Sequence, residues 1–253
     1  MTTTLPWPRP IEQQQKTQCL WYYPAMFTAF SADMFDPQYW QQRNAVVGQA
    51  SGRGTTYFVA EGDRELVLRH YYRGGLIGKV LKDIYFADSV HRTRGYLELQ
   101  RLAQLRERGL PVPQPCAARM VKAGSYYRAD IIVERIAGAR DLLSLLKDAP
   151  LSSDQWHAVG ATIATFHNAD IVHPDLNIQN ILLDVQQKVW LIDFDKSTDP
   201  KGLDWQKKNL LRLRRSLQKQ SGLHGLPFEP QDFQIMVDGY NAAARIPVED
   251  ITV

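Results

Sequence analysis

The chain has little cysteine: Cys19 and Cys116 are its two cysteines in 253 residues. They lie far apart, and neither belongs to a CxxC pair or a Cys/His cluster, so neither a disulfide framework nor a zinc site is expected. No apolar run approaches the roughly 18 to 20 uninterrupted residues that a membrane-spanning helix needs. The first residues also lack the basic start and apolar run of a signal peptide. Any membrane association is therefore expected to be peripheral.

A strong charge of one sign is also absent. Lys and Arg total 30 residues and Asp and Glu 27, which leaves a net charge of +3. This balance does not point to nucleic acid, and we expect neither a nucleic-acid partner nor an obligate protein partner. No internal repeat is evident. With 44% apolar residues, the chain is long enough for one large domain or a two-lobed one with a buried core.

The most informative stretch reads HPDLNIQN over residues 173–180, then ILLD over 181–184 and LIDFD over 191–195. It contains an Asp and an Asn five residues apart on an expected loop, followed by an apolar strand, a polar turn and a second strand ending in Asp. Three oxygen-bearing side chains are thereby supplied from neighbouring loop ends. This order and spacing predict the phosphoryl-transfer centre of a kinase that uses ATP and Mg²⁺.

Each of these side chains has a predicted role. Asp175 is the expected catalytic base, which accepts or orients the proton of the acceptor hydroxyl. Asn180 and Asp193 are expected to hold Mg²⁺, because this hard cation prefers oxygen ligands. His173 is expected to brace the loop rather than to act as a ligand.

Strand-like runs precede this stretch. They lie at 46–47, 55–60 and 66–72, are rich in β-branched or aromatic residues, and are separated by glycine. This pattern predicts a twisted antiparallel sheet. A helix is expected from residues 88–89 to Gly109, where the sequence Leu-Pro-Val-Pro stops it. Most aromatic residues of the first forty positions are expected to pack within an N-terminal arm.

An apolar strand at 131–133 leads into Glu134 and an expected hinge, after which the chain becomes mainly helical. We therefore expect an N-terminal arm over residues 1–40, a small lobe over 41–134 and a large lobe over 135–253. Glu134, at this hinge, is placed with the nucleotide-binding residues.

Two glycines, Gly52 and Gly54, separate two of the strand-like runs. A hairpin at this point could lie over phosphate groups and bind them with backbone N–H groups. The alternative is a tight turn that needs glycine for a positive φ. The position favours the phosphate loop, because the glycines precede a basic strand residue and a helical Glu in the order that a kinase small lobe requires.

That basic residue is Arg69, and the helical carboxylate is Glu98. Glu98 shares an apolar helix stripe with Leu102 and Leu105, so it needs a cationic partner, since an unpaired buried carboxylate would be costly. Arg69 can provide this charge and can also bind phosphate oxygens through two N–H groups. The alternative is a surface Arg at the end of a strand.

The large lobe has clear helix signals. A short helix is expected at 141–147, and Ser152 to Gln155 offer a capping box for a longer one. The buried stripe of that longer helix is Trp156, Val159, Ile163 and Phe166.

A further helix begins near residues 204–205 and has Leu210, Leu213 and Leu217 on one side. Another side carries a cationic stripe, made of Lys208, Arg212, Arg215 and Lys219. The stripe could face anionic lipid headgroups or could simply be a solvated helix face, and both alternatives stay open.

Together these segments resemble the eukaryotic-type kinase fold. The resemblance implies an α+β, bilobal, protein-kinase-like fold with a small antiparallel β-sheet lobe plus one helix and a larger, mainly helical lobe. More closely, VLRHYYRGGLIGK at 67–79, with GRGTTYF at 52–58 and LRLRRS at 211–216, is similar to the Kdo kinases. These are bacterial lipopolysaccharide core kinases that act on 3-deoxy-D-manno-octulosonic acid (Kdo). The likeness runs from about Trp40 to Gln220.

The resemblance implies transfer of the ATP γ-phosphate to the 4-OH of a Kdo residue on a lipid A precursor. The reaction would occur at the cytoplasmic face of a Gram-negative inner membrane, where the protein is peripheral. Matched position by position, Asp175 takes the catalytic role, Asn180 and Asp193 bind the metal, Gly52 and Gly54 form the phosphate loop, and Arg69 and Glu98 form the small-lobe ion pair.

Four departures from protein kinases move the expected acceptor away from protein. Pro174 stands where many protein kinases have Arg, Asn177 stands where they have Lys, and Asp195 replaces a Gly. No Ala-Pro-Glu segment follows.

The segment between Arg69 and Glu98 is expected to contact the substrate. It combines glycines and apolar residues with three cations, Arg73, Lys79 and Lys82. The expected partners are a lipid-linked Kdo sugar and an anionic membrane surface. Two alternatives remain: a soluble small-molecule kinase of the aminoglycoside or choline type, and a pseudokinase scaffold that binds ATP without transferring phosphate.

Overall fold

The computed structural model describes residues 9–51, 54–72, 83–86, 89–195, 202 and 204–249. The chain divides into two compact units, Met1–Gly109 with Pro113–Arg135, and Leu110–Val112 with Ile136–Val253. The first unit is built on an antiparallel sheet with one long helix, and the second is mainly helical. The expected α+β class is thereby confirmed. None of the helices in these described ranges is both long and apolar enough to cross a membrane.

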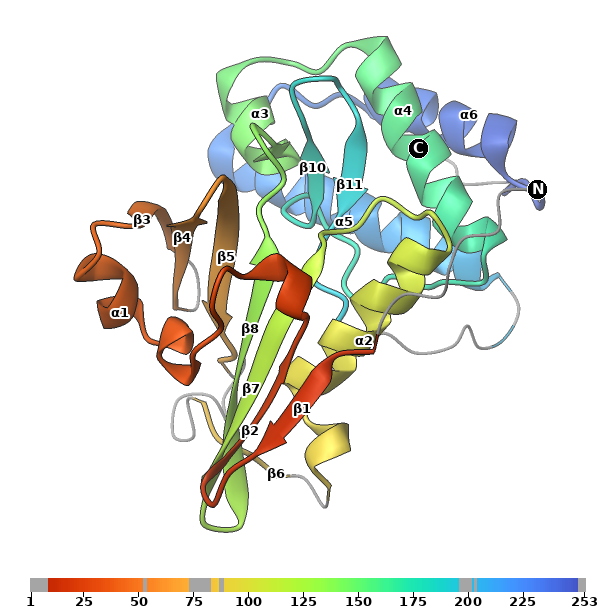
Figure 1. The fold of residues 1–253 in the computed structure, drawn as a ribbon. Coiled ribbons are helices and arrows are strands. Elements are labelled where there is room, and N and C mark those ends of the chain that lie inside the picture. The colour runs from red at the N-terminus through yellow and green to blue at the C-terminus, as the bar shows by residue number, and fades with distance from the viewer. Residues whose placement is uncertain are drawn as a thin grey trace. The chain divides into compact units, whose positions relative to one another are not determined.

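The sheet of the first unit is antiparallel throughout (Figure 1). Its strands follow the order β1-β2-β7-β8-β5-β4-β3, and β6 pairs with the start of β8. The strands are β1 (Ile11–Gln14), β2 (Gln18–Tyr22), β3 (Val46–Ser51), β4 (Thr55–Glu61), β5 (Arg64–His70), β6 (Tyr85–Phe86), β7 (Pro115–Ala123) and β8 (Tyr126–Glu134). The three strand-like runs predicted from the sequence correspond to β3, β4 and β5.

The described part of the first forty residues contributes two strands to this sheet. Strands β1 and β2 form a hairpin, and β2 pairs with β7, with Tyr22 opposite Ala117. The short helix α1 (Pro37–Gln41) follows. The large aromatic residues Trp21, Phe35 and Trp40 are fully buried, so they pack as expected. The sequence did not predict the two strands, because β1 is polar and exposed and lacks an alternating apolar pattern.

Helix α2 (Arg94–Glu107) packs against β7. Its start differs from the prediction, because Ser89 caps a separate 3₁₀ turn over Val90–Arg92 and the α-helix begins only after Thr93. Gly95 allows the helix to come close to the sheet, since a Cβ at this position would lie 2.9 Å from the carbonyl oxygen of Asp130. This close approach brings the buried Glu98 to the sheet.

The second unit contains four helices and a small sheet in its described part. The helices are α3 (Leu142–Asp148), α4 (Ser153–Asn168), α5 (Trp205–His224) and α6 (Pro230–Ala243), and the sheet has the order β11-β10-β9, with β9 (Arg140–Asp141), β10 (Ile181–Leu183) and β11 (Val189–Leu191). The predicted capping box at Ser152 and Gln155 is present. The predicted apolar stripes of α4 and α5 are buried.

Helix α6 was missed from the sequence. Its signals were Pro230 in the first turn and apolar residues at helical spacing, which are Phe233, Met236, Val237 and Tyr240.

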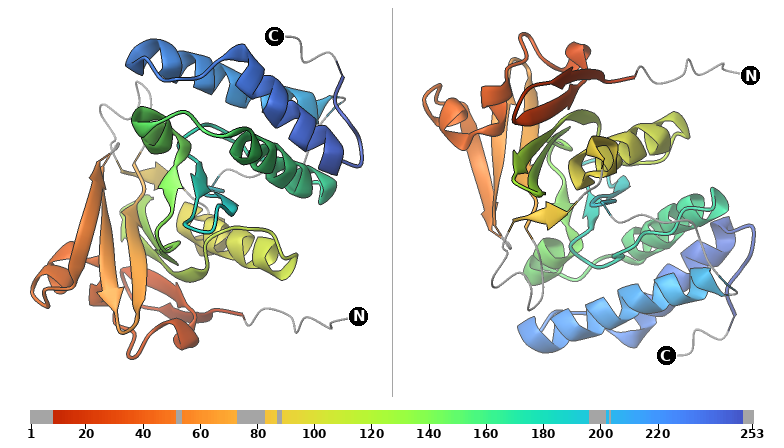
Figure 2. Two further views of the ribbon diagram at one scale, coloured as in Figure 1. Left: turned by 90° about the horizontal axis from the view of Figure 1, so that it is seen from above. Right: turned by 90° about the horizontal axis from the view of Figure 1, so that it is seen from below.

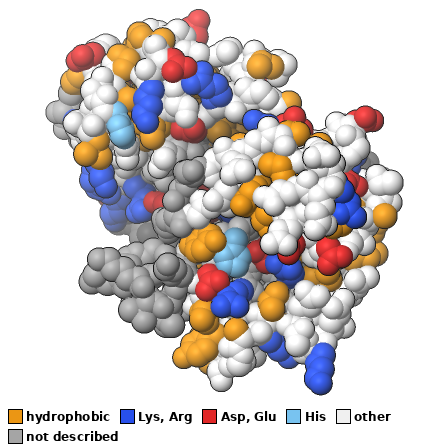
Figure 3. Space-filling view, turned by 90° about the vertical axis from the view of Figure 1, so that its left-hand side faces the viewer, with side chains coloured by type: hydrophobic (Ala, Val, Ile, Leu, Met, Phe, Trp, Pro, Cys, Tyr) orange, Lys and Arg blue, Asp and Glu red, His pale blue; other side chains and the backbone are white. Residues whose placement is uncertain are grey.

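Acidic and basic side chains are mixed across the face of the molecule drawn in Figure 3, in keeping with their near balance in the sequence.

Helices α4 and α6 lie side by side with their backbones in contact (Figure 2). A Cβ on Gly160 would lie 1.8 Å from the carbonyl oxygen of Met236, and a Cβ on Gly239 would lie 2.2 Å from the carbonyl oxygen of His157. Both obstacles are backbone atoms of a neighbouring helix, which cannot turn aside as a side chain can. The two glycines therefore fix the separation of the helices.

We expect Gly160→Ala to lower the free energy of unfolding by about 3 kcal/mol, because the added methyl group forces α4 and α6 apart. Denaturant unfolding measures the change. Gly222→Ala, in α5, is the matched control: no atom lies within 4 Å of its Cβ position, and alanine there is expected to stabilise the helix by up to about 1 kcal/mol. Equal effects of the two substitutions would contradict this account.

Candidate active site

The loop 173–180 of the second unit is held by backbone and side-chain hydrogen bonds. His173 is buried; its Nε2–H donates to the carbonyl oxygen of Ile192 at 2.7 Å, and its Nδ1 accepts from the N–H of Asp175 at 3.1 Å. Burial lowers the pKa of His173, and the bond to Ile192 offsets this only in part. The ring is therefore neutral and braces the loop, as predicted.

The carbonyl oxygen of Asp175 accepts hydrogen bonds from two side-chain amides. Asn177 Nδ2 and Asn180 Nδ2 each donate to it at 2.9 Å. Asn180 thus uses its Nδ2 for this bond, whereas its Oδ1 accepts no hydrogen bond from the described residues. That carbonyl oxygen suits a hard cation, so the donor chemistry of Asn180 fits the predicted metal site.

Asp193 follows the β10–β11 hairpin, which ends next to Asn180. The N–H of Ile192 donates to the backbone oxygen of Asn180 at 3.1 Å, so Asp193 is one residue beyond a direct pairing with this loop. Asp193 has a φ of +69°, a left-handed conformation that non-glycine residues adopt at a cost. Asn180 and Asp193 thus lie at the same end of the hairpin, where their side chains offer an amide carbonyl oxygen and a carboxylate. Both are ligand types that Mg²⁺ prefers.

Side chains on one face of α5 form hydrogen bonds with the backbone of the loop 173–180. Asn209 Nδ2 donates to the carbonyl oxygen of His173 at 2.9 Å, and the hydroxyl of Ser216 accepts from the N–H of Ile178 at 3.3 Å. Between them, Arg212 donates to the carboxylate of Asp175. The spacing of residues 209, 212 and 216 places all three on the same helix face. The sequence had assigned Arg212 to a stripe facing headgroups or solvent and did not anticipate this partner.

A buried chain of hydrogen bonds continues behind Asn209. Its Oδ1 accepts from His167 Nε2 at 3.0 Å, and His167 Nδ1 accepts from the hydroxyl of Tyr240 at 2.9 Å. Burial lowers the pKa of His167 to about 4, despite the opposing effect of Asn209, and burial raises the pKa of Tyr240 to about 12. Both groups are therefore neutral near pH 7. No pattern in the sequence indicated this chain.

In the first unit, the predicted ion pair between Arg69 and Glu98 is present. Arg69 Nη2 lies 2.5 Å from Glu98 Oε2, and the hydroxyl of Tyr71 donates to the same oxygen at 2.5 Å. Glu98 is buried, whereas about a quarter of the Arg69 side chain is exposed. The pair neutralises the carboxylate and leaves part of the guanidinium accessible. Whether Arg69 and Glu98 serve the nucleotide stays a prediction.

Gly54 lies close to the ring of Tyr72. Its φ is not in the left-handed region, but a Cβ at this position would lie 1.9 Å from the ring of Tyr72. Glu134 ends β8; its N–H donates to the carbonyl oxygen of Gln114 at 2.9 Å, and its carboxylate lies 3.9 Å from Arg64. The nucleotide-binding roles of Gly54 and Glu134 stay predictions. Four further predicted site residues, Gly52, Arg73, Lys79 and Lys82, lie outside the described residues.

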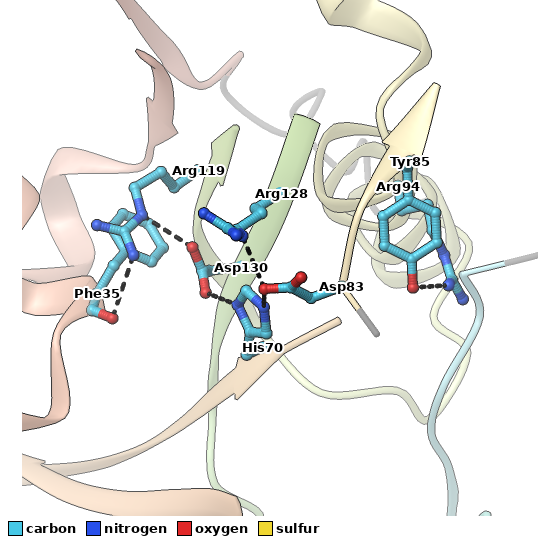
Figure 4. Close-up of polar contacts among 8 residues, drawn as sticks. All are labelled: Phe35, His70, Asp83, Tyr85, Arg94, Arg119, Arg128 and Asp130. Carbon is cyan, nitrogen blue, oxygen red and sulfur yellow. Dashed lines mark hydrogen bonds and ion pairs between the residues drawn. The ribbon is translucent and has the colours of Figure 1, made fainter. Parts of the chain in front are cut away.

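A second polar cluster, which the sequence did not reveal, lies on the sheet of the first unit around His70 (Figure 4). Asp130 is buried and accepts from Arg119 Nε at 2.8 Å and from His70 at 2.6 Å, while Asp83 lies 3.3 Å from His70 and 2.7 Å from Arg128. Burial acts to lower the pKa of His70, but the hydrogen bonds and charges of Asp130 and Asp83 outweigh it and raise the pKa. The cluster ties β5, β7 and β8 together.

A cavity of about 370 Å³ adjoins this cluster. Its walls include Phe35, Tyr57 and Tyr72 besides His70 and Arg119. The cation of Arg119 also lies 5.0 Å from the ring centre of Phe35. The cluster and the cavity belong to the first unit.

The chain matches known proteins over most of its length. The model of the lipopolysaccharide kinase (Kdo/WaaP) family matches residues 37–240. A 3-deoxy-D-manno-octulosonic acid kinase of Vibrio vulnificus (strain YJ016) is 43% identical over 233 residues, which cover 92% of this chain and 99% of the relative. Proteins of the same name from Vibrio cholerae and Haemophilus influenzae (strain 86-028NP) are 41% and 42% identical, over 89% and 83% of this chain and 94% and 91% of the relatives.

The neutral state of His167 gives the protein a specific pH dependence. Between its ordinary pKa of 6.5 and the folded value of about 4, the unfolded chain binds a proton here and the folded chain does not. The free energy of unfolding therefore falls as the pH falls through this range. We expect the stability advantage of the wild type over His167→Gln to shrink by about 3 kcal/mol between pH 7 and pH 4.

Denaturant unfolding of both proteins at each pH measures this difference, and the contributions of the other histidines cancel in the comparison. A difference that stays constant over the whole range would show that His167 is not held neutral.

Proposed function

Because the chain belongs to the lipopolysaccharide kinase (Kdo/WaaP) family, we propose that it transfers the γ-phosphate of ATP to a hydroxyl of a Kdo residue on a lipid A precursor. The observation that carries the proposal is the loop that fixes Asp175, followed by Asn180 and Asp193 at the end of one hairpin. Its close relatives, named as kinases of this sugar acid, support the choice of acceptor. The enzyme is a phosphotransferase with an alcohol acceptor.

In this reaction Asp175 accepts or orients the proton of the acceptor hydroxyl as the hydroxyl attacks phosphorus. Its position is set through its backbone, because its N–H is bound by His173 and its carbonyl oxygen by Asn177 and Asn180. A fixed base can act on the acceptor without losing conformational entropy at the moment of reaction.

Asn180 Oδ1 and the carboxylate of Asp193 would hold Mg²⁺, which neutralises phosphate charge when bound with the nucleotide. Arg69, held by Glu98, supplies a cation for phosphate oxygens. The guanidinium remains charged at any working pH, so this contribution does not depend on proton uptake.

The finer features of the proposal concern the acceptor and its location. The acceptor hydroxyl is the 4-OH, and the enzyme works peripherally at the cytoplasmic face of the inner membrane, where a lipid A precursor is embedded by its acyl chains. The exposed cations Arg215 and Lys219 on α5 support contact with an anionic surface.

An acceptor comparison tests the proposed function. We expect ADP release to rise strongly with Kdo-bearing lipid A precursor and little with free Kdo, an aminoglycoside, choline or protein. Phosphate should appear on the sugar, which mass spectrometry of the product detects. Stimulation by an aminoglycoside or choline alone would favour a soluble small-molecule kinase, and no stimulation by any acceptor would favour a scaffold that binds ATP without transfer.

The two acidic residues should fail in different ways. Asp175→Asn removes the base and is expected to lower kcat by about 10²- to 10⁴-fold while nucleotide affinity is kept. Asp193→Gly removes a metal ligand without placing a side chain at positive φ, so it should weaken Mg-ATP binding itself. Calorimetric titration with Mg and a non-hydrolysable ATP analogue separates the two effects. Equal losses of nucleotide affinity would refute the assigned roles.

A further inference from the structure

Arg212 of α5 places its guanidinium directly on the catalytic carboxylate. Nη2 lies 2.5 Å and Nε 3.2 Å from the same oxygen, Asp175 Oδ1. The two side chains are 47% and 43% exposed, so the pair lies at the surface of the second unit and is open to a ligand.

The other atoms of the pair are unoccupied by the described protein. Asp175 Oδ2 accepts no hydrogen bond from the described residues, and Nη1 of Arg212 donates none to them. Oδ1 is therefore fixed by Arg212, while Oδ2 is available to take the proton of the acceptor hydroxyl. Nη1 offers two further N–H groups to a ligand.

An acid sugar that binds next to Asp175 is repelled by the negative charge of this carboxylate. A carboxylate on the acceptor must approach the carboxylate of Asp175, and two like charges a few ångströms apart repel each other. A guanidinium between them removes the repulsion and binds both anions, since its planar fork carries five N–H donors. No other cation is seen in contact with Asp175 among the described residues.

The position of Arg212 is built into the fold. Asn209 and Ser216, which precede and follow it on the same face of α5, bind the backbone of the catalytic loop at His173 and Ile178. The helix is therefore docked on both sides of Arg212. Arg215, by contrast, is exposed and makes no ion pair or hydrogen bond with the described residues.

We propose that Arg212 is the residue that recognises the carboxylate of the acid sugar acceptor, binding it through Nη1 while Nε and Nη2 hold Asp175. This inference rests on the proposed function, because it names the group of the acceptor that the site selects. Arg212 is then a specificity residue: acid sugars bind better than neutral ones because only they offer a carboxylate to Nη1.

A double-mutant cycle tests the proposal. kcat/KM is measured for the Kdo-bearing lipid A precursor and for the same lipid with the Kdo carboxylate converted to its methyl ester, using the wild type, Arg212→Gln, Arg212→Lys and the control Arg215→Gln. Esterification should lower kcat/KM of the wild type and of Arg215→Gln by about 10- to 100-fold, the range of a hydrogen bond between charged groups. In Arg212→Gln the loss should be less than about 3-fold, and in Arg212→Lys it should be intermediate.

General damage to Asp175 lowers the rate with both acceptors and cancels in this comparison. An equal ester penalty in the wild type and Arg212→Gln would overturn the proposal while leaving the proposed function intact. The same holds if Arg212→Gln also slows the acceptor-independent hydrolysis of ATP and the ester penalty is unchanged, since Arg212 would then act on the transferred phosphate. A wild type that phosphorylates neither lipid would overturn both proposals. Thermal unfolding checks that each variant is folded. If Arg212→Gln does not fold, the ester penalty of Arg212→Lys is compared with that of the wild type instead.

Discussion

The loop that carries Asp175 depends on a chain of buried hydrogen bonds that begins at Tyr240 and ends at the carbonyl oxygen of His173. Tyr240 donates to His167, His167 to Asn209, and Asn209 to the carbonyl oxygen of His173, whose ring in turn accepts from the N–H of Asp175. Each donor has one acceptor only while both histidines are neutral. Protonation of His173 would place an Nδ1–H opposite the N–H of Asp175 and remove this support of the loop. Protonation of His167 would reverse its bond to Tyr240, because the hydroxyl would then have to accept instead of donate.

The close packing of α4 and α6 positions two members of this hydrogen-bond chain, His167 on α4 and Tyr240 on α6. Gly160 lies so near to α6 that a Cβ there would be 2.6 Å from the backbone nitrogen of Tyr240. The absence of a side chain therefore sets how near Tyr240 comes to His167, which lies about two turns along α4 from Gly160. The close packing of α4 and α6 is thus linked to the loop of Asp175 through Tyr240, His167, Asn209 and His173. This also explains why buried polar groups are tolerated here, since every member of the chain is satisfied.

The parts of the site that the sequence predicted are those that local spacing determines. Asp175, Asn180 and Asp193 are separated by one loop and one hairpin, and Glu98 reveals itself by standing on an apolar helix stripe. The parts that it did not predict join distant segments: Arg212 with Asp175, His167 with Tyr240, and His70 with Asp130. Strand β1 was missed because it is polar and exposed. Helix α6 was missed although its apolar residues stand at helical spacing, so this signal was present in the sequence.

The choice of arginine at position 212 follows from what the site must do. A lysine ammonium is a point charge on a flexible stem, so it could neutralise Asp175 but could not fix one carboxylate oxygen with two donors and keep another edge for a second anion. The guanidinium separates these tasks geometrically, because Nε and Nη2 point to Oδ1 and Nη1 points away from it. Binding of an acid acceptor would then tighten the same fork that orients the base. Recognition of the substrate charge and alignment of the catalytic oxygen would be coupled through one rigid plane of atoms.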